Sequence, residues 1–462
     1  MVSHLRFPAP MNRTAVLNIV GLTKGLIGEH TPHISRFCEQ NQVSHFKPAF
    51  PAVTCTAQST YLTGTPPDQH HIVGNGWYDR EAAEVKFWKQ SNHLVHGPKI
   101  WDTLRAKESD FSCAVMFWWY NMYSSADFSA TPRPLYGADG SKHFDIHTHP
   151  MGLREELKND LKEFPFPAFW GPRAGIKSSQ WIADSARWIE KKKQPTLNLI
   201  YLPHLDYCLQ KDGPNADSIP AELRKIDKVV GGLIEFFEKR NVQVRILSEY
   251  GISPVDQAVD LNRSFRRHGW IQVKDELGRE TLDCGTCKVF AVADHQVAHI
   301  YIKDPAMKEE VREFLLATQG VAEVREPVDD DRSGDLVAVA EPNAWFTYYF
   351  WTDDRVAPDY ARTIDIHRKP GYDPCELFID PDIKSPRLKI AKLLLRKKLG
   401  FRTLMDVIPL DASLVKGSHG RDDVPESEQP VYIGPETPGS AVEVHDALIS
   451  ALTEVREPPA AV

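Results

Sequence analysis

The sequence contains no apolar run of membrane-spanning length, and its first residues, MVSHLRFPAPMNRT, lack the apolar core of a signal peptide. It also has no excess of basic residues, because 55 Lys and Arg stand against 63 Asp and Glu, which gives a net charge of −8. This balance argues against a general nucleic-acid binder or anionic-membrane binder. We therefore expect no targeting or membrane segment and no nucleic-acid-binding surface.

Cysteine is scarce and irregularly spaced. The seven cysteines are odd in number and scattered, which suits a reducing compartment better than a disulfide framework and predicts a cytoplasmic protein. Cys284-Gly-Thr-Cys287 is the one CxxC motif and has no second pair at zinc-finger spacing. We interpret it as a turn that leads into the strand KVFAVAD.

Basic residues are concentrated in one stretch, residues 384–402, with the sequence KSPRLKIAKLLLRKKLGFR. Leu and Ile alternate there with Lys and Arg at helical spacing. We interpret this stretch as the solvated face of an amphipathic helix in preference to a phosphate-binding patch.

The length of 462 residues is too great for one simple core, so we expect one large domain with an insertion, or two domains. Short apolar runs that read as buried strands alternate with helical stretches such as residues 178–193. The predicted strands cover residues 14–22, 111–120, 195–206 and 242–251. This alternation predicts an α/β fold, a three-layer sandwich in which helices cover both faces of a mainly parallel central sheet.

The pattern changes from residue 256 to residue 342, where several strands accompany a helix at residues 305–320. We interpret this part as a smaller α+β cap insertion. The core is then assigned to residues 12–255 and 343–435, and residues 436–462 are assigned to a polar C-terminal tail. The sequence does not indicate the oligomeric state.

Polar residues follow several predicted strands directly. Asp206 ends one strand, Ser248-Glu249-Tyr250 follows another, and Thr54 begins a helix after the extended residues Pro51-Ala-Val. Chemistry in parallel sheets gathers at the carboxyl ends of the strands, so these residues are site candidates. Thr54 also suits a helix N-cap, and Cys55 suits a small packing residue.

Four segments, in order, resemble the alkaline phosphatase superfamily, and most closely its branch of type I phosphodiesterases and nucleotide pyrophosphatases. They are AFPAVTCTAQSTYLTGTPPDQHHIVGNGWYD, YLPHLDYCLQKDGP, ILSEYGI and KGSHGRDDVP. Together they span roughly residues 14–255 and 360–425. The resemblance implies hydrolysis of phosphate esters or phosphodiesters on a phosphorylated small molecule.

The resemblance also implies residue roles. Thr54 corresponds to the nucleophile, which forms a covalent phosphothreonine intermediate, and it is also a metal ligand. The remaining metal-ligand candidates are Asp206, His419 and Glu249. The substrate-binding candidates are Gln58, Asn75 and Tyr250. Zinc is the expected metal, with manganese as the alternative, because Asp and His suit both ions.

Several family positions are changed in this chain. The first metal Asp is Val20, the Asp-His pair is Glu249-Tyr250, and the second ligand after Asp206 is Gln210. Val20 cannot ligate a metal, so we expect one ion rather than two. Replacement ligands are sought among His204, Gln210, Asp365 and His367; on a strand, His204 and Asp206 would share one face. Asp294, His295 and His299 of the cap are interpreted mainly as structural residues.

Three classes of function remain open. The first is a metal-dependent hydrolase with Thr54 as its nucleophile. The second is a relative without turnover that binds a phosphorylated ligand or a protein partner, and the third is a phosphoryl transferase or mutase. The hydrolase is favoured, because the helix that begins at Thr54 and the segments HLD, SEYG and GSHG keep polar and chemically capable residues.

Overall fold

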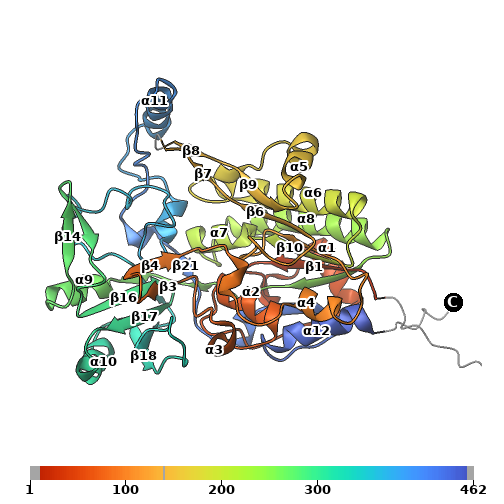
Figure 1. Cartoon of the computed structure of the whole chain (residues 1–462), viewed down its shortest axis with the longest axis horizontal. Coiled ribbons are helices and arrows are strands. Elements are labelled where there is room, and N and C mark those ends of the chain that lie inside the picture. Colours follow the sequence, from red (N-terminus) through yellow and green to blue (C-terminus); the bar gives the residue numbers. More distant parts are fainter. Residues whose placement is uncertain (1–10, 139–140, 455–462) are drawn as a thin grey trace, which may run out of the picture.

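The centre of the protein is an eight-stranded sheet with the strand order β2-β22-β11-β1-β10-β5-β6-β9 (Figure 1). The computed structural model describes residues 11–138 and 141–454. The five inner strands β11, β1, β10, β5 and β6 are parallel, and the strands at both edges are antiparallel. The strand bounds, in sheet order, are Gln42–His45, Val431–Gly434, Gln243–Leu247, Thr14–Ile19, Leu197–Leu202, Cys113–Met116, Phe128–Pro132 and Ile146–His149.

Helices cover both faces of this sheet, which confirms the predicted α/β sandwich (Figure 1). One layer contains α1 (Pro32–Glu39), α5 (Leu153–Leu161), α6 (Ile176–Lys192), α7 (His204–Asp212) and α8 (Ile219–Glu238). The other contains α2 (Thr54–Thr63), α3 (Pro67–His70), α4 (Ile100–Arg105) and α12 (Glu443–Thr453). Short strand pairs lie outside the main sheet: β3 (Gly76–Asp79) with β4 (Glu84–Phe87), β7 (Leu135–Tyr136) with β8 (Lys142–His143), β12 (Ser253–Pro254) with β21 (Gly417–Ser418), and β13 (Gln257–Val259) with β20 (Ala344–Phe346).

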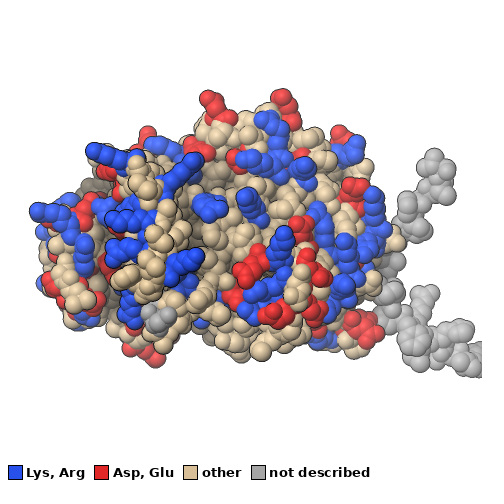
Figure 2. All heavy atoms as spheres, turned by 90° about the horizontal axis from the view of Figure 1, so that it is seen from above, with Lys and Arg blue, Asp and Glu red and all other residues tan. Residues whose placement is uncertain are grey.

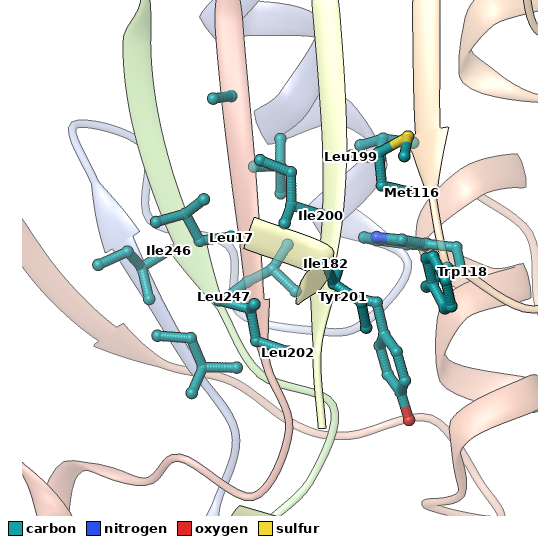
Figure 3. Packing of buried hydrophobic residues seen from close by; sticks show 14 of the residues in the cluster. Leu17, Met116, Trp118, Ile182, Leu199, Ile200, Tyr201, Leu202, Ile246 and Leu247 are labelled. Carbon is teal, nitrogen blue, oxygen red and sulfur yellow. The ribbon is translucent and has the colours of Figure 1, made fainter. Parts of the chain in front are cut away.

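The inner strands are buried on both faces. Every residue of β1 and β10 is buried, and Leu17, Ile200 and Ile246 lie in register on adjacent strands within one buried apolar cluster (Figure 3). A strand that is covered on both faces needs apolar side chains at successive positions. The continuous apolar runs in the sequence reflect this requirement.

All four predicted strands end before their predicted limits, and two of these ends have a clear local cause. The strand predicted for residues 195–206 ends at Leu202, because Pro203 leads directly into α7, whose first residue is His204. His204 and Asp206 therefore lie about 200° apart around a helix and do not share a face. The strand predicted for residues 111–120 ends at Met116, since Phe117 adopts a positive φ of 68° that breaks the extended run.

A second, smaller unit lies at one end of the molecule (Figure 1). It contains an antiparallel sheet of β16 (Val289–Asp294), β17 (Val297–Ile302), β19 (Leu336–Ala340) and β18 (Val321–Arg325), with helices α9 (Leu261–Arg267) and α10 (Lys308–Leu316) and the hairpin β14 (Val273–Glu276)–β15 (Arg279–Leu282). Cys284 and Cys287 lie at a turn shortly before β16, as predicted.

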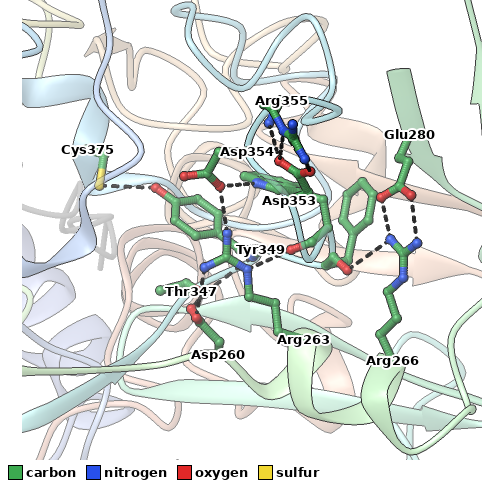
Figure 4. Close-up of polar contacts among 12 residues, drawn as sticks. Asp260, Arg263, Arg266, Glu280, Thr347, Tyr349, Asp353, Asp354, Arg355 and Cys375 are labelled. Atoms are coloured by element: carbon green, nitrogen blue, oxygen red, sulfur yellow. Dashed lines mark hydrogen bonds and ion pairs between the residues drawn. The ribbon is translucent and has the colours of Figure 1, made fainter. Parts of the chain in front are cut away.

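Arginines of α9 form hydrogen bonds and ion pairs with the segment that follows β20 (Figure 4). Arg263 donates hydrogen bonds to the carbonyl oxygen of Trp351 at 2.7 Å and to Asp354 at 3.0 Å. It also donates to Asp260 at 3.0 Å, and Thr347 donates to the other oxygen of that carboxylate. These bonds join α9 to residues 347–354, which follow β20.

The predicted polar tail contains a packed helix. Helix α12 begins at Glu443 and buries Val444, Ala447, Leu448, Ala451 and Leu452, whose spacing places them on one helical face. This face packs against α2 and α4, so residues 443–453 belong to the core rather than to a solvated tail. The last part of the predicted tail, residues 455–462, lies outside the described residues.

Helix α11 (Pro386–Lys398) forms within the basic stretch, as predicted, and projects from the body of the molecule (Figure 1). None of its residues is fully buried. Within the described part of the chain, no helix is both long enough and apolar enough to cross a membrane.

Candidate active site

A narrow pocket lies where the carboxyl ends of β10 and β11 meet the start of α2. Thr54, Asp206 and Tyr250 line its polar side. Its other walls are largely aromatic and include Trp88, Trp119, Trp170, Tyr201, Tyr207 and Tyr372. The cavity volume of about 30 Å³ accommodates roughly two water molecules. The structure therefore brings three of the predicted site residues into one enclosed space.

Thr54 lies at the first position of α2 and is 4% exposed. Its Oγ1 lies 2.9 Å from the hydroxyl oxygen of Tyr250, and that hydroxyl donates to Oδ1 of Asp206 at 3.2 Å. Because Tyr250 has a single hydroxyl proton, which it gives to Asp206, Thr54 must be the donor in the first bond. A directed chain of hydrogen bonds thus leads from Thr54 through Tyr250 to Asp206.

His419 faces the same carboxylate with an unprotonated nitrogen. Its Nδ1 donates to the carbonyl oxygen of Ala52 at 2.7 Å, while its Nε2 lies 3.8 Å from Oδ1 of Asp206 and has no hydrogen-bond partner. The ring stacks on Tyr250 at 3.6 Å between centroids. Burial lowers the pKa of His419 to about 3, so the imidazole is neutral and its Nε2 carries a free lone pair.

Asp206 is poised near neutral pH. Burial raises its pKa to about 6, against the opposing effect of hydrogen bonds from Gln210 and Tyr250. The Gln210 amide nitrogen donates to Asp206 at 2.8 Å, and its amide oxygen accepts from Tyr372 at 3.1 Å. Gln210 therefore orients the carboxylate, and both ends of its amide are already engaged.

Glu249 is fully buried beside this chain. One of its oxygens accepts hydrogen bonds from the amides of Asn18 and Gln58, each at 2.6 Å, and the other has no partner. Burial raises the pKa of Glu249 to about 8, although these hydrogen bonds oppose the shift. The side chain therefore favours its protonated form near pH 7, and it would have to release that proton to bind a metal ion.

Gln58 and Asn75, the predicted substrate-binding amides, support the framework of the site. The Gln58 oxygen accepts from the backbone N–H of Trp119 at 2.7 Å, so this amide too is engaged at both ends. Asn75 accepts from the backbone N–H of Cys55 at 3.0 Å and donates to Asp294 at 3.0 Å. Asn75 thus holds the first turn of α2 and links it to the cap.

The other predicted ligands lie outside this pocket. His204 pairs with Glu222 of α8 at 3.0 Å. His367 bonds to the carbonyl oxygen of Phe87 at 3.2 Å and lines a separate apolar pocket. Asp365 lies 3.8 Å from Arg368 and is not a lining residue of the active-site pocket.

His295 is a site residue that the sequence interpretation placed among structural residues. Its ring lies 3.7 Å from that of His419 and 3.8 Å from that of Tyr372, between centroids, and it lines the pocket. Burial lowers its pKa well below the usual value, with a further contribution from His419. The cap therefore supplies one wall of the site. The available sequence signal for His295 was its position directly after β16, in Asp294-His295-Gln296.

The donor set fits the two-ion arrangement of the resembling family poorly. In the described residues, no group of three or more His, Cys, Asp and Glu side chains is arranged to hold a metal ion. Val20 is a buried apolar residue, Glu249 is mainly protonated, and burial raises the pKa of Tyr250 well above its usual range. Asp206 and His419 still fit a single ion, because the free Nε2 of a backbone-anchored histidine is a typical metal donor.

The charges around the pocket are mainly negative. Asp206, Asp373 and Glu376 line it, and none of the described lining residues is Lys or Arg. Buried Lys369 lies 2.7 Å from each of the carboxylates of Asp373 and Glu376 and compensates their charge. Burial alone would lower the pKa of Lys369, but the two carboxylates raise it.

Comparison with known families identifies the chain. A family model described as type I phosphodiesterase / nucleotide pyrophosphatase matches residues 14–373. The chain belongs to this family. The resemblance seen in the sequence motifs is thereby confirmed, and members of the type I phosphodiesterase family typically depend on divalent metal ions.

Two curated fungal proteins are similar over part of their length. A pyrophosphatase/phosphodiesterase of Schizosaccharomyces pombe is 26% identical over 258 residues, which cover 52% of this chain and 46% of the relative. Ectonucleotide pyrophosphatase/phosphodiesterase 1 of Saccharomyces cerevisiae is 22% identical over 316 residues, which cover 64% of this chain and 38% of the relative. The matched regions thus span less than half of each of these relatives.

Solved structures share the fold of this type I phosphodiesterase family member. The inactive form of murine ectonucleotide pyrophosphatase/phosphodiesterase 5, in complex with AMP, has a TM-score of 0.56 at 13% identity and covers 97% of this chain and 96% of its own. Phosphonoacetate hydrolase from Sinorhizobium meliloti, in complex with phosphonoformate, has a TM-score of 0.58 at 14% identity and covers 98% of both chains. At these identities the likeness shows the fold alone.

Proposed function

We propose that this protein hydrolyses phosphodiesters, with Thr54 as the nucleophile that forms a phosphothreonine intermediate. The observation that carries the proposal is the buried hydroxyl of Thr54, which lies at the start of α2 and donates into a chain that ends at Asp206. A threonine hydroxyl is a weak nucleophile unless its proton has an acceptor. Membership of the type I phosphodiesterase family supports the same class of reaction.

The hydrogen-bond chain defines the route of the proton. As the oxygen of Thr54 bonds to phosphorus, its proton passes to Tyr250, and the Tyr250 proton passes to Asp206. The bond from phosphorus to the leaving oxygen breaks, and the leaving group departs as an anion that takes a proton from solvent water. Water later attacks phosphorus and loses a proton to solvent, the bond from phosphorus to Thr54 breaks, and the proton held by Asp206 returns through Tyr250 to Thr54. The N-terminus of α2 favours the negative charge of the phosphoryl group.

We further propose that Asp206 and His419 hold one divalent ion, most simply zinc, with manganese as the alternative. A bound ion supplies positive charge to the phosphoryl oxygens. Water or substrate oxygens would complete its coordination, since the described chain offers no third His, Cys, Asp or Glu ligand there. The free Nε2 of His419 supports this assignment.

The pocket favours a phosphodiester over a phosphomonoester. A diester carries one negative charge, whereas a monoester approaches two at neutral pH, and the described pocket walls contain no Lys or Arg to compensate the second charge. The aromatic side chains are suited to stacking on a planar group. A nucleotide substrate agrees with these walls and with the AMP complex of the murine structure.

Binding without turnover is the second candidate. Val20 replaces an acidic family ligand, and the protonated Glu249 is held by Asn18 and Gln58 instead of facing a metal. These features favour a protein that retains the pocket for a phosphorylated ligand. Hydrolysis remains our main proposal, because such a protein would not require the directed bond from Thr54.

We also propose that the protein works in the cytoplasm. All seven cysteines are free thiols, and five of them are buried. An oxidising compartment would expose such a chain to disulfide formation between unpaired thiols during folding.

The test of function is hydrolysis of bis(p-nitrophenyl) phosphate by the purified chain, with zinc or manganese added. We expect p-nitrophenolate release that Thr54→Ala abolishes and Thr54→Ser partly retains. Thr63→Ala, at the other end of α2, is the matched control and should remain active. Metal content would be measured in the same preparations by elemental mass spectrometry, with His419→Ala expected to lose the ion. Metal-loaded protein without turnover would favour the second candidate, and activity in Thr54→Ala would refute the nucleophile.

A further inference from the structure

Helix α11 presents leucines to solvent on the side that faces away from the protein. Leu388, Leu395 and Leu399 are 71%, 58% and 65% exposed, and their spacing of seven and four residues places them on one helical face. Ile390 and Leu393 lie on the inner side, where they pack against the apolar cluster that contains Val407 and Ile408. The helix is therefore anchored by one apolar face and exposes a second.

Basic side chains surround this exposed face. Residues 384–402 contain eight Lys and Arg and no Asp or Glu, although the whole chain has a net charge of −8. Figure 2, which looks down on this side of the molecule, shows Lys and Arg gathered around uncharged residues over the region of α11. Lys389 is paired with Asp406 at 3.0 Å, whereas Lys392, Arg396 and Lys398 are exposed beside the leucines.

The hairpin β7–β8 extends the same surface. Lys397 of α11 donates to the carbonyl oxygen of Lys142 at 3.5 Å, which brings the two elements together. Tyr136 of β7 is 57% exposed, Phe144 is 47% exposed, and Phe401 after α11 is 59% exposed. We call residues 384–402 together with Leu135, Tyr136, Lys142 and Phe144 the α11 surface.

The α11 surface adjoins the side of the protein that leads to the active site. Tyr136 and Lys142 line the separate apolar pocket that also contains His367. That pocket shares Trp119, Phe169 and Trp170 with the active-site pocket. The surface is therefore separated from the catalytic residues by a shared wall of aromatic side chains.

We propose that the α11 surface docks the protein onto a membrane that contains anionic phospholipid. An interfacial helix inserts its apolar side chains at the boundary between headgroups and acyl chains, while Lys and Arg extend along it to the phosphates. Exposed aromatic side chains at the same level are typical of such an interface. The exposed side chains of Lys392, Arg396 and Lys398 need a charge complement, and an anionic bilayer supplies it over the whole surface at once. Two copies of the chain that met through their α11 surfaces would bring like charges together, which disfavours a symmetric dimer through this surface.

The net charge of −8 averages over the whole chain and conceals a local surface of the opposite sign. The sequence pattern of residues 384–402 predicts only the solvated face of an amphipathic helix, whereas the structure shows apolar residues on an exposed face of α11 as well. The docking proposal does not depend on Thr54 or on the proposed reaction.

The test is co-sedimentation of the full chain with vesicles of phosphatidylcholine, with or without phosphatidylserine. We expect binding to the mixed vesicles that weakens with salt and is much weaker with phosphatidylcholine alone. Leu395→Glu and Leu399→Glu should each reduce affinity by about tenfold or more, because each removes an inserted leucine and adds a negative charge. The control is Leu316→Glu on α10, whose leucine is 54% exposed outside this surface, and it should bind as the unmodified chain does.

A second set of variants tests the charges separately. Lys392→Ser, Arg396→Ser and Lys398→Ser combined should abolish the preference for phosphatidylserine while leaving the circular dichroism spectrum unchanged. Failure of the unmodified chain to bind mixed vesicles at low salt would overturn the proposal. So would equal binding by the leucine variants, or a dimer in sedimentation velocity that Leu395→Glu dissociates, since that would assign the surface to a second copy.

Discussion

The buried acid Glu249 makes the stability of this protein depend on pH in a predictable direction. Burial raises its pKa from 4.5 to about 8 in the folded state, whereas the unfolded chain keeps the ordinary value. Between these two values the folded protein holds a proton that the unfolded chain has released. Stability therefore falls as pH rises through this range, by roughly 2 kcal/mol between pH 6 and pH 8.

Glu249→Gln removes this titration and keeps the local hydrogen bonds. The amide oxygen of glutamine can accept from Asn18 and Gln58 as the present carboxyl oxygen does, each at 2.6 Å. We expect the variant to match the unmodified protein near pH 4, where the glutamate is protonated in both the folded and the unfolded state, and to be the more stable of the two by about 2 kcal/mol at pH 6. At pH 8 this advantage should be larger by about a further 2 kcal/mol, which is the loss that the unmodified protein suffers between the two pH values.

Urea unfolding followed by tryptophan fluorescence at pH 6 and pH 8 measures this difference directly. Other titrating groups affect both proteins alike and cancel in the comparison. Glu84→Gln, which changes an exposed glutamate of β4, is the charge-matched control and should follow the unmodified protein. If Glu249→Gln loses as much stability between the two pH values as the unmodified chain, the buried protonated carboxyl is refuted.

Three further substitutions test other parts of the site. Tyr250→Phe removes the hydroxyl between Thr54 and Asp206, so kcat for a diester should fall about hundredfold with little change in KM; a normal kcat would exclude the proton route. Lys369→Met leaves two buried carboxylates unpaired and should lower the free energy of unfolding by about 3–5 kcal/mol in urea, whereas a neutral result would show that they are protonated. Asn75→Ala removes the bonds to Cys55 and Asp294 and should cost about 2–3 kcal/mol in the same assay; unchanged stability would contradict its framework role.

The parallel core was predictable because burial on both faces leaves a direct trace in the sequence. Strands β1, β10 and β11 appear as largely apolar runs, and the polar residues Asp206 and Tyr250, which follow β10 and β11, meet in one pocket at the carboxyl ends of the strands. The ends of these runs were less predictable. Apolar character continues past Met116 into Trp118 and Trp119, which are buried in loops instead of strands, and periodicity does not distinguish these cases.

The motifs brought Thr54, Asp206 and Tyr250 together correctly, but they did not reveal how these residues interact. Asn18 was hidden within a strand that reads as apolar, although its amide fixes Glu249. The direction of the hydrogen bond from Thr54 depends on the single proton of Tyr250 and on an Asp206 oxygen that lies 3.2 Å away. Such distances follow from the packing of α2, α7 and the loop after β11, which are remote from one another in sequence. A sequence pattern does not give these distances.

His295 shows why the cap had to be seen in place. On sequence it is one of several histidines in a β-rich insertion, and a buried structural role is the commoner outcome for such a residue. In the fold, Asp294 accepts from Asn75, and the turn after β16 therefore places His295 against His419 and Tyr372. The same asparagine holds the first turn of α2. One side chain, that of Asn75, therefore positions both α2 and the part of the cap that contains His295. A displacement of the cap would move Asn75 and, with it, the first turn of α2 that contains Thr54.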